Sequence, residues 1–293
     1  MPPPRPRRPA LVAAGLAATL ALVPPATACT SFLLPTSDGA AVYGRTMEFG
    51  FELASEVVVL PRGYAFEGAA PAGNGLDWTG RYGVVGLNAF GLPIVADGVN
   101  EKGLAGGLLY FPDYAGYADP KTADPKSALA PWEVLTWALT NFATVAEVKA
   151  AIAGISVVGL VEPSLGIVPP FHYTFHDETG ASLVVEPVDG TLKVYDNPVG
   201  VMTNAPGFDW HLTNLKNYVK LSPVNAAPIT VLGDRIASFG QGSGLLGIPG
   251  DPTPPSRFVR ALGYAVSAER KPSGVESVRL AEHILNNFDI PIG

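Results

Sequence analysis

Residues 26–49 have the sequence ATACTSFLLPTSDGAAVYGRTMEF, which places the only cysteine of the chain, Cys29, directly before a predicted β-hairpin. The stretches Thr30 to Leu34 and Ala41 to Phe49 contain many strand-forming residues. The Asp38-Gly39 pair between them is typical of a tight turn between antiparallel strands. The sequence therefore predicts that Cys29 lies at the start of the first strand of an antiparallel sheet.

The 28 residues before this cysteine have the order of a secretory signal. Three arginines among the first eight residues precede an apolar run from Ala10 to Val23, and Ala26-Thr-Ala28 places small residues at −3 and −1 of a cleavage site. The run is shorter than the roughly 20 residues of a transmembrane helix, and no later stretch is long and apolar enough. We expect cleavage between Ala28 and Cys29, export to the periplasm or the medium, and a single domain over residues 29–293.

The composition of this mature chain excludes several classes of function. Without the three arginines of the signal, 26 acidic and 16 basic residues remain, a formal charge of −10. An acidic surface argues against nucleic acid or an anionic membrane as the partner. One cysteine and four scattered histidines predict neither an internal disulfide nor a metal site, and we expect no cofactor. A lone cysteine in an exported protein indicates a reactive thiol or an intermolecular bridge.

Hairpins followed by helices predict an α+β fold rather than a parallel α/β fold. Three strands separated by Gly-containing turns are predicted in the second half of the chain, with a short fourth; they cover Phe171–His176, Ser182–Val188, Thr191–Tyr195 and 201–203. Helical periodicity and a Thr144–Glu147 capping box predict four helices. These cover Trp132–Phe142, 144–154, Ser256–Ala268 and Val275–Asn287.

The position of Cys29 suggests how its thiol is activated. A thiol attacks only as thiolate and needs a base nearby. At a free N-terminus the α-amine, with a pKa of about 8, can take the proton of a thiol whose pKa is about 8.5. Two alternatives remain. Ala-Thr-Ala-Cys also resembles a lipoprotein site, although Leu is usual where Ala26 stands, and the cysteine can be buried and inert.

The hairpin brings Gly44-Arg-Thr-Met-Glu48 near the cysteine, in one of two registers. A two-residue loop at Asp38-Gly39 places Cys29 opposite Glu48, and a five-residue loop places it opposite Arg45. An arginine beside the sulfur stabilises a thiolate, and a carboxylate can hold the α-amine or the arginine. A solvated surface pair of Arg45 and Glu48 is an equally good interpretation of the spacing.

Five sequence blocks occur in the order typical of one enzyme family. They are Cys29-Thr30, 44–48, 97–103, Met202-Thr-Asn-Ala-Pro206 with Phe208-Asp209, and 240–251 with Ser256-Arg-Phe258. From Cys29 to about Asn287 the chain resembles the choloylglycine hydrolase family, which includes bile salt hydrolases and penicillin V acylases. The resemblance implies a four-layer αββα sandwich of the N-terminal-nucleophile type, hydrolysis of linear amides through a thioester, and a homotetramer.

The resemblance also implies roles for individual residues. Cys29 matches the nucleophile, Arg45 the arginine beside it and Arg257 a second arginine of the site. The side-chain amide of Asn204 matches one donor to the oxyanion, and the backbone N–H of Tyr110 matches the other. Preorganised donors of this kind stabilise the negative charge that develops during acyl transfer.

In the same resemblance, Glu48 bears on the α-amine of Cys29 and Tyr110 bears on the choice of substrate. Glu48 stands where the family usually has an aspartate that contacts the amine, which is a departure of one methylene. Tyr110 stands where penicillin V acylases typically have Tyr and bile salt hydrolases Asn. We therefore expect phenoxyacetyl or medium-chain acyl amides, penicillins and N-acyl homoserine lactones among them, to be better substrates than bile salts. Aromatic residues expected near the cleft are Phe49, Phe51, Trp78, Phe90, Phe111 and Tyr114.

The alternative functions are a bile salt hydrolase and a lipid-anchored binding protein without activity, acylated at Cys29. The chain ends at Gly293, soon after the last predicted helix, whereas the resemblance implies further strands that complete the sheets. The sequence thus predicts either a truncated end or a sandwich that closes differently.

Overall fold

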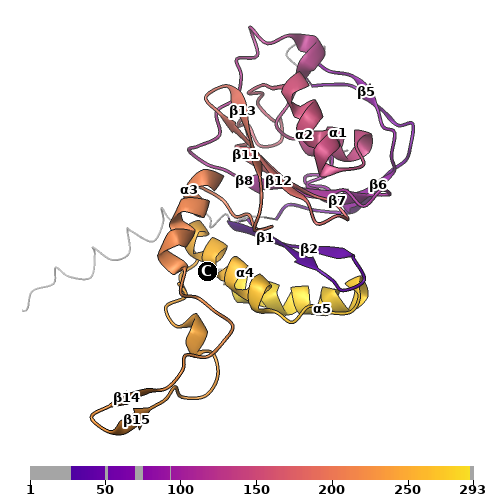
Figure 1. The fold of residues 1–293 in the computed structure, drawn as a ribbon. Helices are drawn as coiled ribbons and strands as arrows, with labels where there is room; N and C mark the ends of the chain where they lie inside the picture. Colours follow the sequence, from indigo (N-terminus) through magenta and orange to yellow (C-terminus); the bar gives the residue numbers. More distant parts are fainter. Residues whose placement is uncertain (1–27, 50–51, 70–74, 93, 291–293) are drawn as a thin grey trace, which may run out of the picture.

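The structure is a computed structural model that describes residues 28–49, 52–69, 75–92 and 94–290. The predicted signal peptide lies outside the described residues except for Ala28. The molecule has four layers, which are seen edge-on in Figure 1. They are helices α1 and α2, a large sheet, the β1–β2 hairpin, and helices α4 and α5. This arrangement confirms the predicted αββα sandwich.

The large sheet has seven antiparallel strands in the order β13-β12-β11-β8-β7-β6-β3. In chain order their bounds are β3 Val57–Leu60, β6 Val84–Leu87, β7 Asp97–Asn100, β8 Ala105–Tyr110, β11 Phe171–His176, β12 Ser182–Val188 and β13 Thr191–Asp196. The last three confirm the prediction, and the first four were not predicted. Strands β7 and β8 contain glycines that weaken a strand pattern but permit close contact between layers. At Gly106, for example, a Cβ atom would lie 2.9 Å from Leu135 Cδ1 in the helix layer.

The second β layer is the hairpin of β1 (Ala28–Pro35) and β2 (Ala41–Glu48). Its register pairs Cys29 with Met47, so both predicted registers are wrong. The free edge of β1 pairs with Met202 through an isolated bridge, within the short strand predicted at 201–203. Smaller pairs are β4 (Ala65–Phe66) with β5 (Trp78–Thr79) and β9 (Ala128–Leu129) with β10 (Ser156–Val157).

All four predicted helices are present, with ends shifted by a few residues. They are α1 Val134–Asn141, α2 Val145–Ala151 with a 3₁₀ turn to Gly154, α4 Pro254–Ser267, and α5 Gly274–Leu285 with a 3₁₀ turn to Phe288. The Thr144 hydroxyl accepts the Glu147 N–H at 3.2 Å, as the capping box predicts. Helix α3 (Phe208–Asn214) was not predicted.

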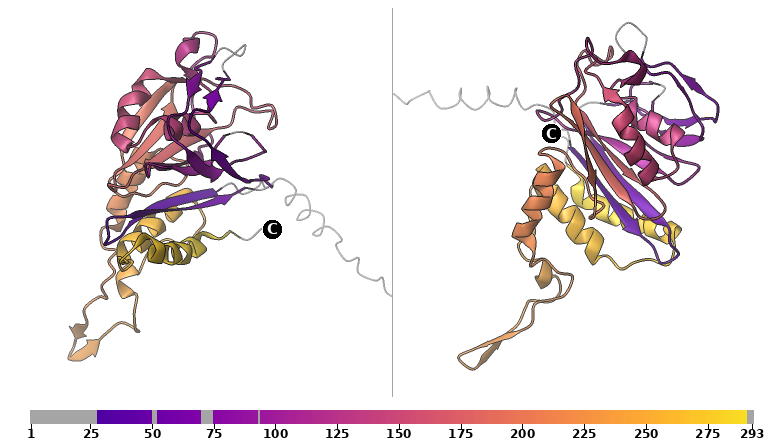
Figure 2. Two further views of the ribbon diagram at one scale, coloured as in Figure 1. Left: turned by 90° about the vertical axis from the view of Figure 1, so that its right-hand side faces the viewer. Right: turned by 45° about the horizontal axis from the view of Figure 1, so that its top comes forward.

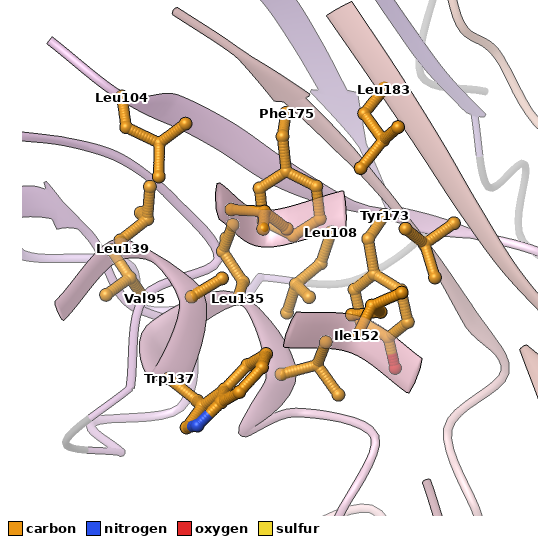
Figure 3. Packing of buried hydrophobic residues seen from close by; sticks show 14 of the residues in the cluster. Val95, Leu104, Leu108, Leu135, Trp137, Leu139, Ile152, Tyr173, Phe175 and Leu183 are labelled. Carbon is orange, nitrogen blue, oxygen red and sulfur yellow. The ribbon is translucent and has the colours of Figure 1, made fainter. Parts of the chain in front are cut away.

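Two apolar cores hold the layers together. The first lies between α1, α2 and the large sheet, and Figure 3 shows its side chains, including Leu135, Tyr173 and Phe175. The second lies between the hairpin and the helices α3, α4 and α5, around Phe32 and Phe258. Apolar residues alternate along β1, so Phe32 and Leu34 enter the second core while Cys29 faces the large sheet.

Two surfaces lie outside these cores. The hairpin of β14 (Ile229–Val231) and β15 (Asp234–Ile236) projects from the body on a long arm, as Figure 2 shows. Every residue of its two strands is exposed. Between the β1–β2 hairpin and strands β3, β6 and β7 lies a groove of about 1060 Å³. Exposed apolar side chains of the large sheet border it, among them Val57, Val85 and Val99.

Candidate active site

Cys29 lies between the two β layers and is 1% exposed. Alternation along the paired strands places its side chain on the same hairpin face as Arg45 and Met47, toward β8. Arg45 Nη2 lies 3.3 Å from Cys29 Sγ. A guanidinium at this distance stabilises a developing thiolate, which fits the role expected for Arg45.

Arg45 is held by groups of the large sheet. Its Nη1 forms an ion pair with Asp97 Oδ2, and its Nη2 donates to the Leu108 carbonyl at 2.6 Å. Asp97 also accepts the Tyr43 hydroxyl at 3.1 Å, and burial raises the pKa of Tyr43 to about 12, so that this hydroxyl remains a donor. A Cβ atom at Gly107 would overlap Asp97 and Tyr43. The glycine therefore makes room for the ion pair that orients Arg45.

Asn204 joins the cysteine to the end of β8. The backbone bridge between Ser31 and Met202 brings residues 201–204 alongside β1, two residues from Cys29. Asn204 Oδ1 accepts the Cys29 N–H at 2.9 Å, and Asn204 Nδ2 donates to the Tyr110 carbonyl at 2.7 Å. The cysteine nitrogen, which is a peptide nitrogen in the full-length chain, is thus fixed by a side chain 175 residues away.

The backbone of Tyr110 faces the same space. The Leu108 N–H donates to the Ala96 carbonyl, and the Phe111 N–H donates to the Pro170 carbonyl on the opposite side of the strand. Alternate residues of a strand direct their N–H groups to the same side, so the Tyr110 N–H points away from β11, as the Leu108 N–H does. The Tyr110 carbonyl points to this side as well, where it accepts the Asn204 amide. The Tyr110 N–H therefore lies on the same side of β8 as the Tyr110 carbonyl that accepts the Asn204 side-chain amide.

Arg257, in the first turn of α4, supports the site from the helix layer and is 1% exposed. It donates to the Cys29 carbonyl, to Thr30 Oγ1 at 2.7 Å and to Asn204 Oδ1 at 2.7 Å. Burial lowers the pKa of Arg257 to about 10, which leaves it a cation at neutral pH. It fixes the backbone of Cys29 and the side chain of Asn204 at the same time.

His211 on α3 was not predicted as a site residue. Its Nε2 lies 3.0 Å from the Asn204 carbonyl oxygen, and its ring stacks on Phe258 at 4.6 Å. Burial lowers the pKa of His211 to about 4, so the ring is neutral at pH 7, and Nε2 carries the hydrogen because it faces a carbonyl. Asn204 is thus held through its backbone as well as its side chain.

A cavity of about 480 Å³ opens onto Cys29 and Arg45. Most of its wall is apolar, and the aromatic residues that line it are Phe49, Phe90, Tyr110, Trp132 and Phe171. Of the six aromatic residues expected at the cleft, the structure therefore confirms Phe49 and Phe90. Three lie elsewhere: Trp78 stacks on Phe66, Phe111 is buried against His172, and Tyr114 is exposed. Phe51 lies outside the described residues.

Glu48 is adjacent to the site but faces the other side of the hairpin. It pairs with Ala28, and its carboxylate accepts the Thr46 hydroxyl at 3.1 Å. Within the described residues it has no hydrogen bond to the cysteine. Partial burial raises the pKa of Glu48, against the opposing effects of the hydrogen bond from Thr46 and the charge of Arg257. Because Ala28 would leave on cleavage, Glu48 lies beside the position of the new terminus.

We expect Glu48→Gln to shift the pH dependence of a mature enzyme that starts at Cys29. A nearby carboxylate favours the ammonium form of the α-amine, and only the neutral amine acts as a base. Loss of the charge should therefore move the acid limb of the kcat/KM–pH profile to lower pH by up to about one unit. Glu52→Gln, at an exposed carboxylate, is the control. Identical profiles for Glu48→Gln and the parent would remove Glu48 from the site.

Within residues 28–290, apart from the gaps given above, no group of three His, Cys, Asp or Glu side chains is arranged to bind a metal ion. The same part of the chain has no helix of the length and apolarity needed to cross a membrane.

A buried thiol beside a guanidinium, at an apolar cavity and with a side-chain amide bonded to the cysteine nitrogen, is typical of hydrolases that use a cysteine to cleave amide bonds. Residues 29–293 match the linear amide C–N hydrolases of the choloylglycine hydrolase family, and the chain belongs to this family. A bile salt hydrolase/transferase of Clostridium perfringens (strain 13 / Type A) is 38% identical over 266 residues, which are 88% of this chain and 78% of the relative.

Solved structures of the family have the same fold. The crystal structure of a single-residue variant of conjugated bile acid hydrolase from Clostridium perfringens has a TM-score of 0.78 and 33% identity, covering 90% of this chain and 80% of its own. Penicillin V acylase from Agrobacterium tumefaciens has a TM-score of 0.74 and 26% identity, and the match covers 90% of this chain and 74% of the acylase. Both neighbours support the fold and the amide-hydrolase class predicted from the sequence.

Proposed function

We propose that the mature protein begins at Cys29 and hydrolyses the amide bond of an acyl–amino acid conjugate with a bulky apolar acyl group, a conjugated bile salt in the first place. The observation that carries this proposal is the largely apolar cavity of about 480 Å³ that opens onto the cysteine. Cavities of this size bind most of the surface of a small molecule. The match to the family begins at Cys29, which is consistent with a nucleophile at the mature terminus.

In the proposed mechanism, the α-amine of Cys29 takes the proton from its own thiol, and Arg45 stabilises the thiolate. Sulfur attacks the amide carbon, and the oxyanion accepts hydrogen bonds from Asn204 Nδ2 and the Tyr110 N–H. The ammonium returns its proton to the leaving nitrogen, and the C–N bond breaks. Water, deprotonated by the same amine, then attacks the thioester and releases the carboxylic acid.

Similarity supports bile salts more strongly than the phenoxyacetyl preference expected from Tyr110. Among the solved structures, the conjugated bile acid hydrolase variant of C. perfringens is 33% identical to this chain, whereas the penicillin V acylase is 26% identical. Penicillin V remains the second candidate, because Tyr110 lines the cavity and narrows it with an aromatic face.

The test is kcat/KM of the purified mature protein on glycine-conjugated bile salts, penicillin V and an N-acyl homoserine lactone. We expect the bile salt conjugates to be preferred by about 10- to 200-fold, the range that pocket fit supplies. A preference for penicillin V in the same assay would reverse the substrate assignment and leave the cysteine chemistry in place. No turnover of any of the three would contradict the proposed function.

We also propose export after cleavage between Ala28 and Cys29. Support comes from the signal-like order of residues 1–28. The competing arrangement is an anchor in which Cys29 carries lipid and has no catalytic function. The intact mass of the protein secreted by an exporting host distinguishes the two, because a free Cys29 terminus and a diacylglyceryl cysteine differ by the mass of the lipid.

A further inference from the structure

The cavity beside Cys29 contains a carboxylate that the proposed chemistry does not use. Glu162 lies in the loop between β10 and β11, lines the cavity and is only 3% exposed. Its backbone is fixed in a tight turn, since its N–H donates to the Ile167 carbonyl at 2.9 Å and its carbonyl accepts the Gly166 N–H at 2.8 Å. Gly166 has a φ of 67°, which favours glycine and closes this turn. The carboxylate is therefore held against one wall.

The two oxygens of this carboxylate have different surroundings. Oε2 accepts the Leu165 N–H at 2.8 Å. Among the described residues, no group donates a hydrogen bond to Oε1, and no cation pairs with Glu162. Oε1 is not one of the fully buried polar atoms without a partner, so it remains accessible to water in the cavity. A carboxylate oxygen that loses this water without gaining a donor loses its hydration without compensation. A ligand that fills the cavity and excludes water must supply the missing donor.

We propose that Glu162 Oε1 accepts a hydrogen bond from a hydroxyl group on the acyl part of the substrate. The inference rests on the proposed function, in which the acyl group occupies this cavity. A neutral hydroxyl fits the site better than an ammonium group, because the neighbouring wall consists of Leu165, Ile167, Pro169 and Phe171. Bringing a cation into such a wall has a desolvation cost that one carboxylate rarely offsets. The preferred acyl group is thus apolar and hydroxylated rather than purely hydrocarbon.

The effect should appear as selectivity between acyl groups that differ by one hydroxyl. A hydrogen bond to a charged, buried acceptor corresponds to about 10- to 100-fold in affinity. Steroid acyl groups allow the comparison, since they are available with no hydroxyl or with a single hydroxyl at position 3, 7 or 12. One of these positions should meet Glu162, and the others should give no comparable gain.

The experiment measures binding rather than turnover. Glycine conjugates of the four acyl groups are titrated by calorimetry into mature Cys29→Ala protein, and into the same protein with Glu162→Leu or Glu162→Gln. We expect one hydroxylated conjugate to bind at least about 10-fold more tightly than the conjugate without a hydroxyl. This ratio should fall to about 1 in Glu162→Leu. It should be intermediate in Glu162→Gln, which keeps a polar group that can bond the Leu165 N–H.

The control is Asp119→Leu, which removes a carboxylate that also caps its own turn, by accepting the Lys121 N–H at 2.9 Å, but lies outside the cavity. This variant should keep the full ratio. Equal binding of all four conjugates, a ratio that survives Glu162→Leu, or no binding of any conjugate would each overturn the inference. Glu162-dependent binding without turnover by the Cys29 enzyme would instead leave the inference standing and contradict the proposed function.

Discussion

Replacement of Cys29 by alanine is expected to lower kcat/KM by about 10⁴-fold or more while leaving the protein folded. The chain has no other cysteine, and Sγ is the atom that Arg45 Nη2 approaches at 3.3 Å. Without the sulfur no thioester can form, and the donors at Asn204 and Tyr110 retain only the part of catalysis that charge stabilisation supplies.

The same substitution should change stability little. Cys29 borders the second core, and the exchange of a thiol for a hydrogen removes one buried atom at a cost of about 1 kcal/mol. For a domain of this size that corresponds to a fall in Tm of about 2–4 °C. Turnover and Tm are measured on variants whose mature N-terminus has been verified by mass. More than a few per cent of the parent activity in correctly processed Cys29→Ala would contradict a cysteine nucleophile.

The hairpin that carries the cysteine could be predicted from residues 30–49, but its register could not. Register depends on loop length, and Asp38-Gly39 is compatible with several lengths. The observed turn depends on Thr36, whose hydroxyl donates to the Ala40 carbonyl at 2.8 Å. A shift of one residue reverses the face of every side chain, so the side of the hairpin on which Glu48 lies was not predictable.

Parts of the site that come from distant segments were found only through the family resemblance. Asn204 and Arg257 reach Cys29 across separations of 175 and 228 residues, and no local pattern encodes such contacts. Asp97 was within a matched block but had no expected role, because its short strand Asp-Gly-Val-Asn has a weak strand pattern. No local sequence pattern marks Glu162, because its place in the cavity wall arises only in the folded chain.

In the proposed mechanism, Cys29 provides both the nucleophile and its base. The backbone nitrogen of Cys29 lies 2.9 Å from Asn204 Oδ1. It is therefore inside the site, and it belongs to the same residue as the thiol. A peptide nitrogen has no basic lone pair, whereas an α-amine with a pKa of about 8 is partly neutral near physiological pH. A single residue left before Cys29 therefore removes the base without removing any side chain. We expect this extension to lower kcat by about 10²- to 10⁴-fold, the range for general-base catalysis.

The most direct test compares two proteins that differ only at the N-terminus, one that begins at Cys29 and one that retains Ala28, each verified by intact mass. We expect both proteins to have the same Tm within about 2–4 °C, a difference worth about 1 kcal/mol. Only the protein beginning at Cys29 should hydrolyse a glycine-conjugated bile salt at an appreciable rate. Full activity of the protein that retains Ala28, with its mass unchanged after the assay, would show that the α-amine of Cys29 is not the base.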